Sequence, residues 1–78
     1  MGALRKRSLV VAGHSTSLAL EPEFWNALED AAEARSVTLV RLLADIDETR
    51  SGRSLASACR VAALKFAAEA PPKASKAG

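Results

Sequence analysis

Residues 15–25 are the stretch of this chain that most constrains its fold, because a short strand pattern runs there, without a turn, into a helix. Alternation with a period of two gives the strand one largely apolar and one small or polar face: Thr16, Leu18 and Leu20 against Ser15, Ser17 and Ala19. Pro22 suits the first turn of a helix, and Glu21 and Glu23 suit its positive end. A lone strand lacks ladder partners for its backbone, so we expect a second copy of the chain to pair with it.

The length and composition favour a small non-enzymatic domain. A chain of 78 residues forms one domain with a modest core, so we expect oligomerisation to supply additional buried surface. Cys59 is the only cysteine and His14 the only histidine, which excludes an intramolecular disulfide and a Cys/His metal cluster. The sequence contains neither a glycine-rich phosphate loop nor a recognisable catalytic set. We therefore expect no enzymatic activity, no cofactor and no metal.

The charges are distributed unevenly along the chain, although the formal net charge is only +2. Residues 1–20 contain Arg5, Lys6 and Arg7 and no acid, whereas residues 21–34 contain five acids and no base. Basic residues again outnumber acids from Arg35 onward. This polarity predicts one face for an anionic partner and another that faces water.

The sequence predicts a cytoplasmic protein. A basic cluster precedes the apolar run of residues 9–12, but this run is shorter than the ~7–15 residues of a signal-peptide core. No segment approaches the ~20 apolar residues that a membrane-spanning helix needs.

The chain divides into a flexible basic arm at residues 1–7, a folded domain at 8–69 and a disordered tail at 70–78. Within the domain we expect a strand at about 15–20 and helices at about 22–35, 38–50 and 54–69, with Thr38 or Ser36 as the N-cap of the second helix. The third helix has an almost continuous apolar surface, so we expect it to be covered on more than one side. Residues 8–11 favour a strand that either extends the first one or folds back as a hairpin.

Three segments carry a resemblance to a known family: residues 13–25, residues 38–43 and residues 55–61. Their order and spacing, with Leu28 and Ala32 between them, resemble the ribbon-helix-helix DNA-binding proteins, in particular a bacterial subgroup of short members with an added C-terminal helix. The resemblance implies a mainly α fold with one N-terminal β-strand, and an intertwined homodimer with a two-stranded antiparallel ribbon. The implied dimer core consists of Leu18, Leu20, Phe24, Trp25, Leu28, Leu39, Leu42, Leu43 and Ile46.

The resemblance also implies a way of binding double-stranded DNA. Ser15, Ser17 and Ala19 would point outward from the ribbon into the major groove, while the amides near Thr38 and Leu39 and the Thr38 hydroxyl would hold phosphates. A further hypothesis is that Arg5, Lys6, Arg7 and His14 reach phosphates or an adjacent groove. The outward side chains of the strand are short, which predicts weak base-specific readout compared with Arg, Lys, Gln or Asn.

The sequence therefore favours a small transcriptional regulator that associates with the nucleoid when bound to DNA. Two other interpretations remain open. The same dimer fits a protein-interaction module, antitoxin-like or adaptor, that uses the third helix or the tail. Alternatively, the third helix drives assembly beyond a dimer, with little DNA binding. Among individual residues, Cys59 is expected to be an inert packed thiol, and Trp25 an anchor of the core or of the dimer interface.

Overall fold

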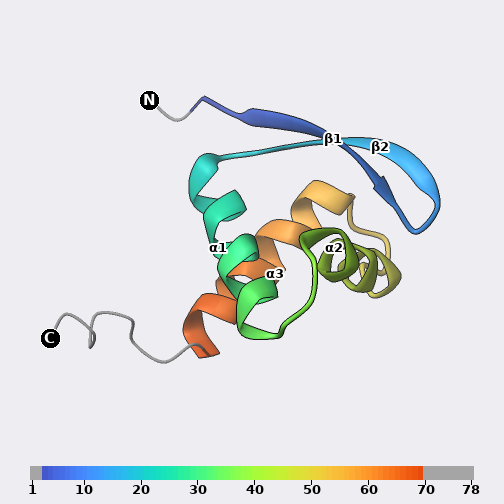
Figure 1. Ribbon diagram of the computed structural model, residues 1–78. Helices are drawn as coiled ribbons and strands as arrows, with labels where there is room; N and C mark the ends of the chain where they lie inside the picture. Colours follow the sequence, from blue (N-terminus) through green and yellow to red (C-terminus); the bar gives the residue numbers. More distant parts are fainter. Residues whose placement is uncertain (1–2, 70–78) are drawn as a thin grey trace, which may run out of the picture.

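The computed structural model describes residues 3–69 and contains two strands followed by three helices. In chain order these are β1 (Arg5–Val11), β2 (His14–Leu20), α1 (Pro22–Ala34), α2 (Leu39–Glu48) and α3 (Leu55–Glu69). The strands form a two-stranded antiparallel sheet, and the helices gather on one face of it (Figure 1). This arrangement agrees with the ribbon-helix-helix architecture with an added helix that the resemblance implies.

The two strands are joined by a tight hairpin turn at Ala12 and Gly13. Both residues have positive φ, at 53° and 82°, the signs of a type I′ turn, whose twist matches that of the flanking strands. The register pairs Val11 with His14 and continues to Arg5 opposite Leu20. The expectation of a lone strand without a partner in its own chain is therefore wrong, because β1 pairs with β2 along its whole length. Residues 8–11 fold back as a hairpin, which was one of the two possibilities.

Residues 5–7 lie in β1 and not in a flexible arm, so that expectation is also wrong. The physical reason is tertiary, because their backbone pairs with residues 18–20 of β2 and the Arg7 side chain packs against α1. Cross-strand pairing and packing commonly outweigh the low intrinsic strand preference of basic residues. The expected tail at residues 70–78 lies outside the described residues.

Local capping defines the helix ends. Glu21 separates β2 from α1, and its extended backbone allows Pro22 to open the helix. Thr38 is the N-cap of α2, and its Oγ1 accepts a hydrogen bond from the Arg41 amide at 3.1 Å. Ser54 caps α3 in the same way, since its Oγ accepts a bond from the Ser57 amide at 3.1 Å.

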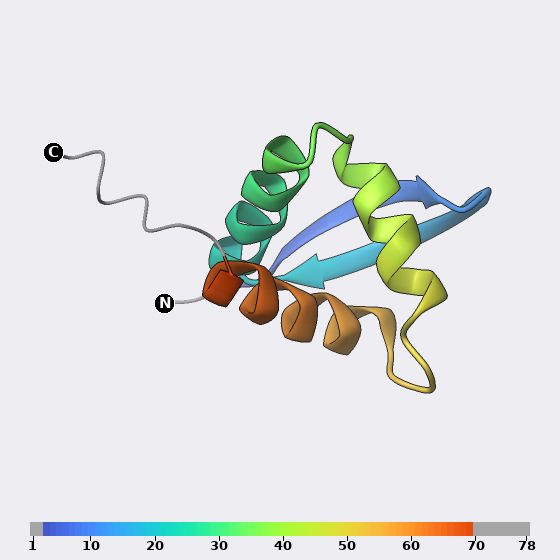
Figure 2. The same ribbon diagram turned by 90° about the horizontal axis from the view of Figure 1, so that it is seen from below.

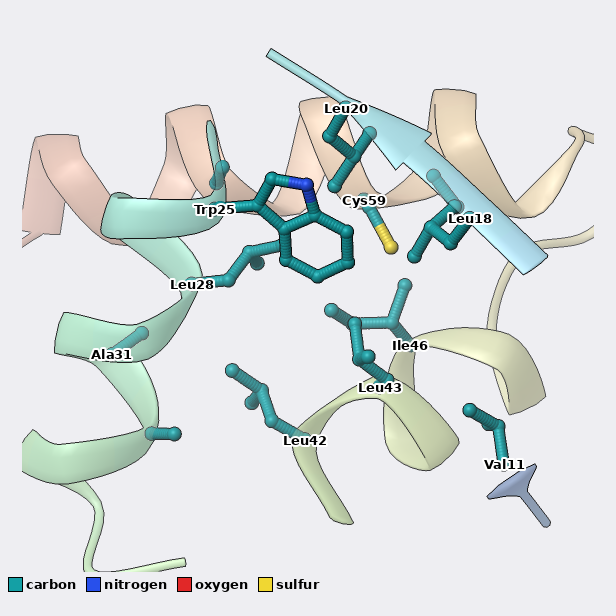
Figure 3. Close-up of a cluster of buried hydrophobic side chains, with 13 residues drawn as sticks. Val11, Leu18, Leu20, Trp25, Leu28, Ala31, Leu42, Leu43, Ile46 and Cys59 are labelled. Atoms are coloured by element: carbon teal, nitrogen blue, oxygen red, sulfur yellow. The ribbon is translucent and has the colours of Figure 1, made fainter. Parts of the chain in front are cut away.

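The core lies between the hairpin and the helices and closes within one chain. Its largest fully buried side chains come from β2 and all three helices: Leu20, Trp25, Leu28, Leu43 and Cys59 (Figure 3). Of the nine residues expected in a dimer core, Phe24 and Leu39 are half-buried and the other seven are buried. A second copy is therefore not required to cover them.

The third helix completes this core. It packs against α1, α2 and β2, as expected for a helix with an almost continuous apolar surface. Its buried positions are Ala58, Cys59 and Ala63, whereas Leu64 on another side of the helix is 69% exposed. Among the described residues, no helix is long and apolar enough to cross a membrane.

Candidate nucleic-acid interface

One face of the hairpin points away from the helices, and no element within residues 3–69 covers it. We call it the outward face, and it is built from three cross-strand pairs: Lys6 with Ala19, Ser8 with Ser17, and Val10 with Ser15. Ala19 is half-buried and the other five residues are exposed, with Val10 at 59%. The outward face therefore combines one cation, three hydroxyls and two small apolar groups on a two-stranded ribbon.

The opposite face of the hairpin packs onto the helices. Leu18 and Leu20 from β2 are 3% and 0% exposed, and Val11 from β1 is also buried. Because side chains alternate along a strand, the burial of Leu18 and Leu20 places Ser17 and Ala19 on the other face. The strand phase inferred from the sequence therefore agrees with the structure.

Arg7 is held against α1 and does not belong to the outward face. Its Nη1 lies 3.0 Å from Oε2 of Glu29, and its guanidinium lies 4.5 Å from the centre of the Trp25 ring. A guanidinium over the face of an indole is attracted by the ring quadrupole. These two contacts fasten β1 to α1 and place Arg7 on the helix side of the hairpin.

The other two basic residues of β1 have different surroundings. The backbone carbonyl of Arg5 accepts a hydrogen bond from Trp25 Nε1 at 2.8 Å, which satisfies the single donor of the buried indole. The Arg5 side chain is exposed, and its register partner is the core residue Leu20. Lys6 is exposed on the outward face and forms no ion pair with residues 3–69. Lys6 is therefore the cation that the fold offers on this face.

The remaining residues expected at DNA lie elsewhere in the molecule. His14 is exposed directly after the hairpin turn, and its phase places it with Thr16 and Leu18, not with the outward face. Thr38 and Leu39 begin α2, which lies beneath the hairpin on the helix side (Figure 1). The first turn of α2 contains no acidic residue, so its free amides retain their positive potential. Within one chain, however, this helix start is not part of the outward face.

Sequence reasoning missed Ser8 and Val10, which complete the outward face from β1. The signal was present, because Lys6, Ser8 and Val10 alternate with Arg7, Leu9 and Val11. Two alternating segments separated by two residues, the second a glycine, are typical of a β-hairpin. Once β1 is recognised as the partner of β2, the register assigns both residues to this face.

Two titratable groups near the core have shifted pKa values. Arg60 Nε lies 3.0 Å from Glu21 Oε1, and this hydrogen bond lowers the pKa of the Glu21 carboxyl. Burial raises the pKa of the Cys59 thiol to about 11. Cys59 is therefore a neutral packed thiol near pH 7, and a buried neutral thiol is a poor nucleophile.

Comparison with known proteins agrees with this architecture. The family model described as a ribbon-helix-helix domain matches residues 4–67, which run from the residue before β1 almost to the end of α3. This family is a non-enzymatic fold whose members are generally DNA-binding regulators. No curated protein and no solved structure matches the chain. Since the match covers well over half of the sequence, the chain belongs to the ribbon-helix-helix domain family.

Proposed function

We propose that this protein is a small transcriptional regulator that inserts the outward face of its hairpin into the major groove of double-stranded DNA. The observation that supports the proposal best is the hairpin itself, because one face packs on the helices while the other is exposed. The major groove is about 12 Å wide and admits a two-stranded ribbon. As a regulator, the protein would act in the bacterial cytoplasm, associated with the nucleoid.

The chemistry of the outward face predicts how DNA is read. Ser8, Ser15 and Ser17 offer hydroxyls that donate or accept hydrogen bonds, and Val10 and Ala19 offer apolar contact to thymine methyl groups. None of these five side chains can form a bidentate bond to a base edge. Base discrimination should therefore be modest, and much of the affinity should come from Lys6 and from phosphate contacts.

We further propose that the protein acts as a homodimer. Each strand of a two-stranded sheet keeps one unpaired edge, and such edges are templates for pairing with another chain. Pairing through the hairpins would double the outward face and place two copies of Lys6 along one groove. In this arrangement the amides at Thr38 and Leu39, the exposed Arg5 side chain and His14 would contact flanking phosphates.

The test measures binding of fluorescent DNA duplexes, first selected from a random pool, by anisotropy over a range of salt concentrations. Lys6→Glu should weaken binding by about tenfold or more and reduce the salt slope by about one unit per site. Lys65→Glu is the matched control, since it makes the same charge change on an exposed position of α3. It should leave the affinity within about twofold.

Two results would contradict this function. If Lys6→Glu and Lys65→Glu weakened binding equally, net charge and not the outward face would determine affinity. If no duplex bound even at low salt, where electrostatic attraction is strongest, the protein would not be a DNA-binding regulator.

A second function is favoured by one observation on α3. A groove lies between α2 and α3, and half-buried Val61 and Phe66 give it apolar surface. An exposed apolar groove is typical of a protein-interaction site. An antitoxin-like or adaptor role through α3 is therefore our second candidate.

A further inference from the structure

A groove of about 460 Å³ lies between α2 and α3, and no hairpin residue lines it. In Figure 2, α2 and α3 leave the turn that joins them and spread apart. The residues of α3 that line the groove are at positions 58, 61, 62, 65, 66 and 69. Their spacing of three and four places them on a single helix face. Buried Leu42 and Ile46 and half-buried Val61 and Phe66 make much of its surface apolar.

The rim of the groove is predominantly positive. Its cations are Arg35, Arg50, Arg53 and Lys65, and its acids are Asp45 and Glu69. Asp45 is already paired with Arg41 at 3.3 Å, and Arg50 with Asp47 at 2.7 Å. Three of the rim cations therefore remain without an ion pair to any described residue: Arg35, Arg53 and Lys65.

Each of these three cations is placed to receive an anion. The Arg35 guanidinium lies 4.4 Å from the centre of the Phe66 ring, which keeps it over the apolar part of the groove. Arg53 makes a long hydrogen bond of 3.5 Å from Nη1 to Ser57 Oγ. Lys65 is exposed one residue before Phe66. An apolar ligand with carboxylates on its flanks would complement this surface.

Three other occupants fit less well. The chain's own residues 70–78 contain two lysines and no acid, so the positive rim would repel them. The acidic helix α1 of a second copy uses its apolar side for its own core at Trp25, Leu28 and Ala31, and could offer only charges. The nucleic-acid backbone would satisfy the cations but gain nothing from the apolar surface.

We propose that the groove between α2 and α3 binds an acidic amphipathic helix of another protein. The apolar stripe of that helix lies on Val61, Ala62 and Phe66. Its Asp and Glu side chains pair with Arg35, Arg53 and Lys65. Laying the apolar face of a helix into a groove is a recurrent mode of peptide recognition. The inference deepens the second candidate function and does not depend on DNA binding.

The experiment titrates the full-length ¹⁵N-labelled protein with a capped synthetic peptide of roughly 18 residues, long enough to form a helix. The probe carries Leu at helical spacing of three and four, flanked by Glu, and the control peptide carries Lys in place of every Glu. The acidic probe should shift amide signals of α2 and α3 and saturate. The Lys peptide should bind about tenfold more weakly or worse.

Variants of the chain locate the contact. Lys65→Glu and Arg53→Glu reverse exposed charges on the rim, so each should lower the affinity for the acidic peptide about tenfold. The circular dichroism spectrum should be unchanged, which shows that the fold is intact. Lys6→Glu is the matched control on the outward face and should leave peptide affinity within about twofold. Lys6→Glu is expected to impair DNA binding, whereas Lys65→Glu is expected to impair peptide binding. Failure of one proposal is therefore distinguishable from failure of the other.

Any of four results would overturn the inference. These are no saturation up to about 1 mM peptide, equal affinity for the acidic and basic peptides, signal changes only at residues that do not line the groove, and no effect of Lys65→Glu and Arg53→Glu. If a DNA duplex shifted the amide signals of the groove residues, the groove would be a nucleic-acid site. If these signals shifted when the protein concentration was raised without peptide, a second copy of the chain would fill the groove.

Discussion

At the scale of single residues, Trp25 joins the hairpin to the helices. Its side chain is 1% exposed, donates a hydrogen bond to the Arg5 carbonyl at 2.8 Å and lies under the Arg7 guanidinium. Trp25→Phe keeps an aromatic ring but removes the donor and part of the buried volume, so we expect a loss of about 2 kcal/mol in the free energy of unfolding. Denaturant unfolding followed by circular dichroism measures this loss.

The matched variant is Arg7→Met, which removes the ion pair to Glu29 and the contact with the indole. Both side chains of this pair are partly exposed, so solvent screens their attraction and the expected cost is about 1 kcal/mol or less. An equal or larger cost for Arg7→Met than for Trp25→Phe would show that Arg7, and not the buried indole, carries the stability of this junction.

Cys59 supplies a prediction about pH. Because burial raises the pKa of its thiol to about 11 from an ordinary 9.0, the native thiol should resist iodoacetamide near pH 8, whereas the denatured chain should react. Above its ordinary pKa the unfolded chain releases the thiol proton first, so stability from this group should fall as pH rises from about 9 to 11. Mass spectrometry after timed alkylation measures the reaction. Equal rates in native and denatured protein would contradict the buried, neutral thiol.

At the scale of elements, the hairpin turn contains a residue that is not optimal for its backbone. Ala12 has a φ of 53°, a conformation that Asn tolerates better than Ala. We therefore expect Ala12→Asn to raise the free energy of unfolding by up to about 1 kcal/mol, because Asn-Gly is the preferred type I′ pair. Gly13→Ala should lower the free energy of unfolding by about 1 kcal/mol. The cost comes from the positive φ at this position and not from a clash, since nothing lies within 4 Å of an added Cβ. Destabilisation by Ala12→Asn, measured by thermal unfolding, would contradict the turn type.

The same turn shows where sequence-based prediction succeeds and where it fails. The helices and the phase of β2 were predictable, because caps such as Thr38 and the burial period of Leu18 and Leu20 are local signals. β1 was harder to predict, because Ala-Gly is a weaker turn signal than Asn-Gly and because Arg7 faces the helices. The position of Arg7 depends on Trp25 and Glu29 in α1, which no local pattern encodes. For this reason Ser8 and Val10 were missed from the candidate site.

At the scale of the whole molecule, the fold separates the two surfaces that we propose for recognition. Among the described residues, the outward face belongs to the hairpin, whereas the groove between α2 and α3 is lined by the helices and the turns that follow α1 and α2. The core between them is closed by side chains of one chain. A regulator built in this way can contact DNA through one element and a protein through another without either partner competing for the same residues.

A core that closes within one chain makes a specific prediction about the dimer. At micromolar concentration, sedimentation should show a homodimer, and dilution should give folded monomers, since the seven core residues are already buried in each chain. The unfolding temperature of the diluted protein should then depend little on concentration, unlike that of an obligate dimer, which loses stability by mass action. A monomer at micromolar concentration would contradict the proposed homodimer. Conversely, a steep fall of the unfolding temperature on dilution would show that the chains are intertwined and that neither hairpin nor core is stable alone.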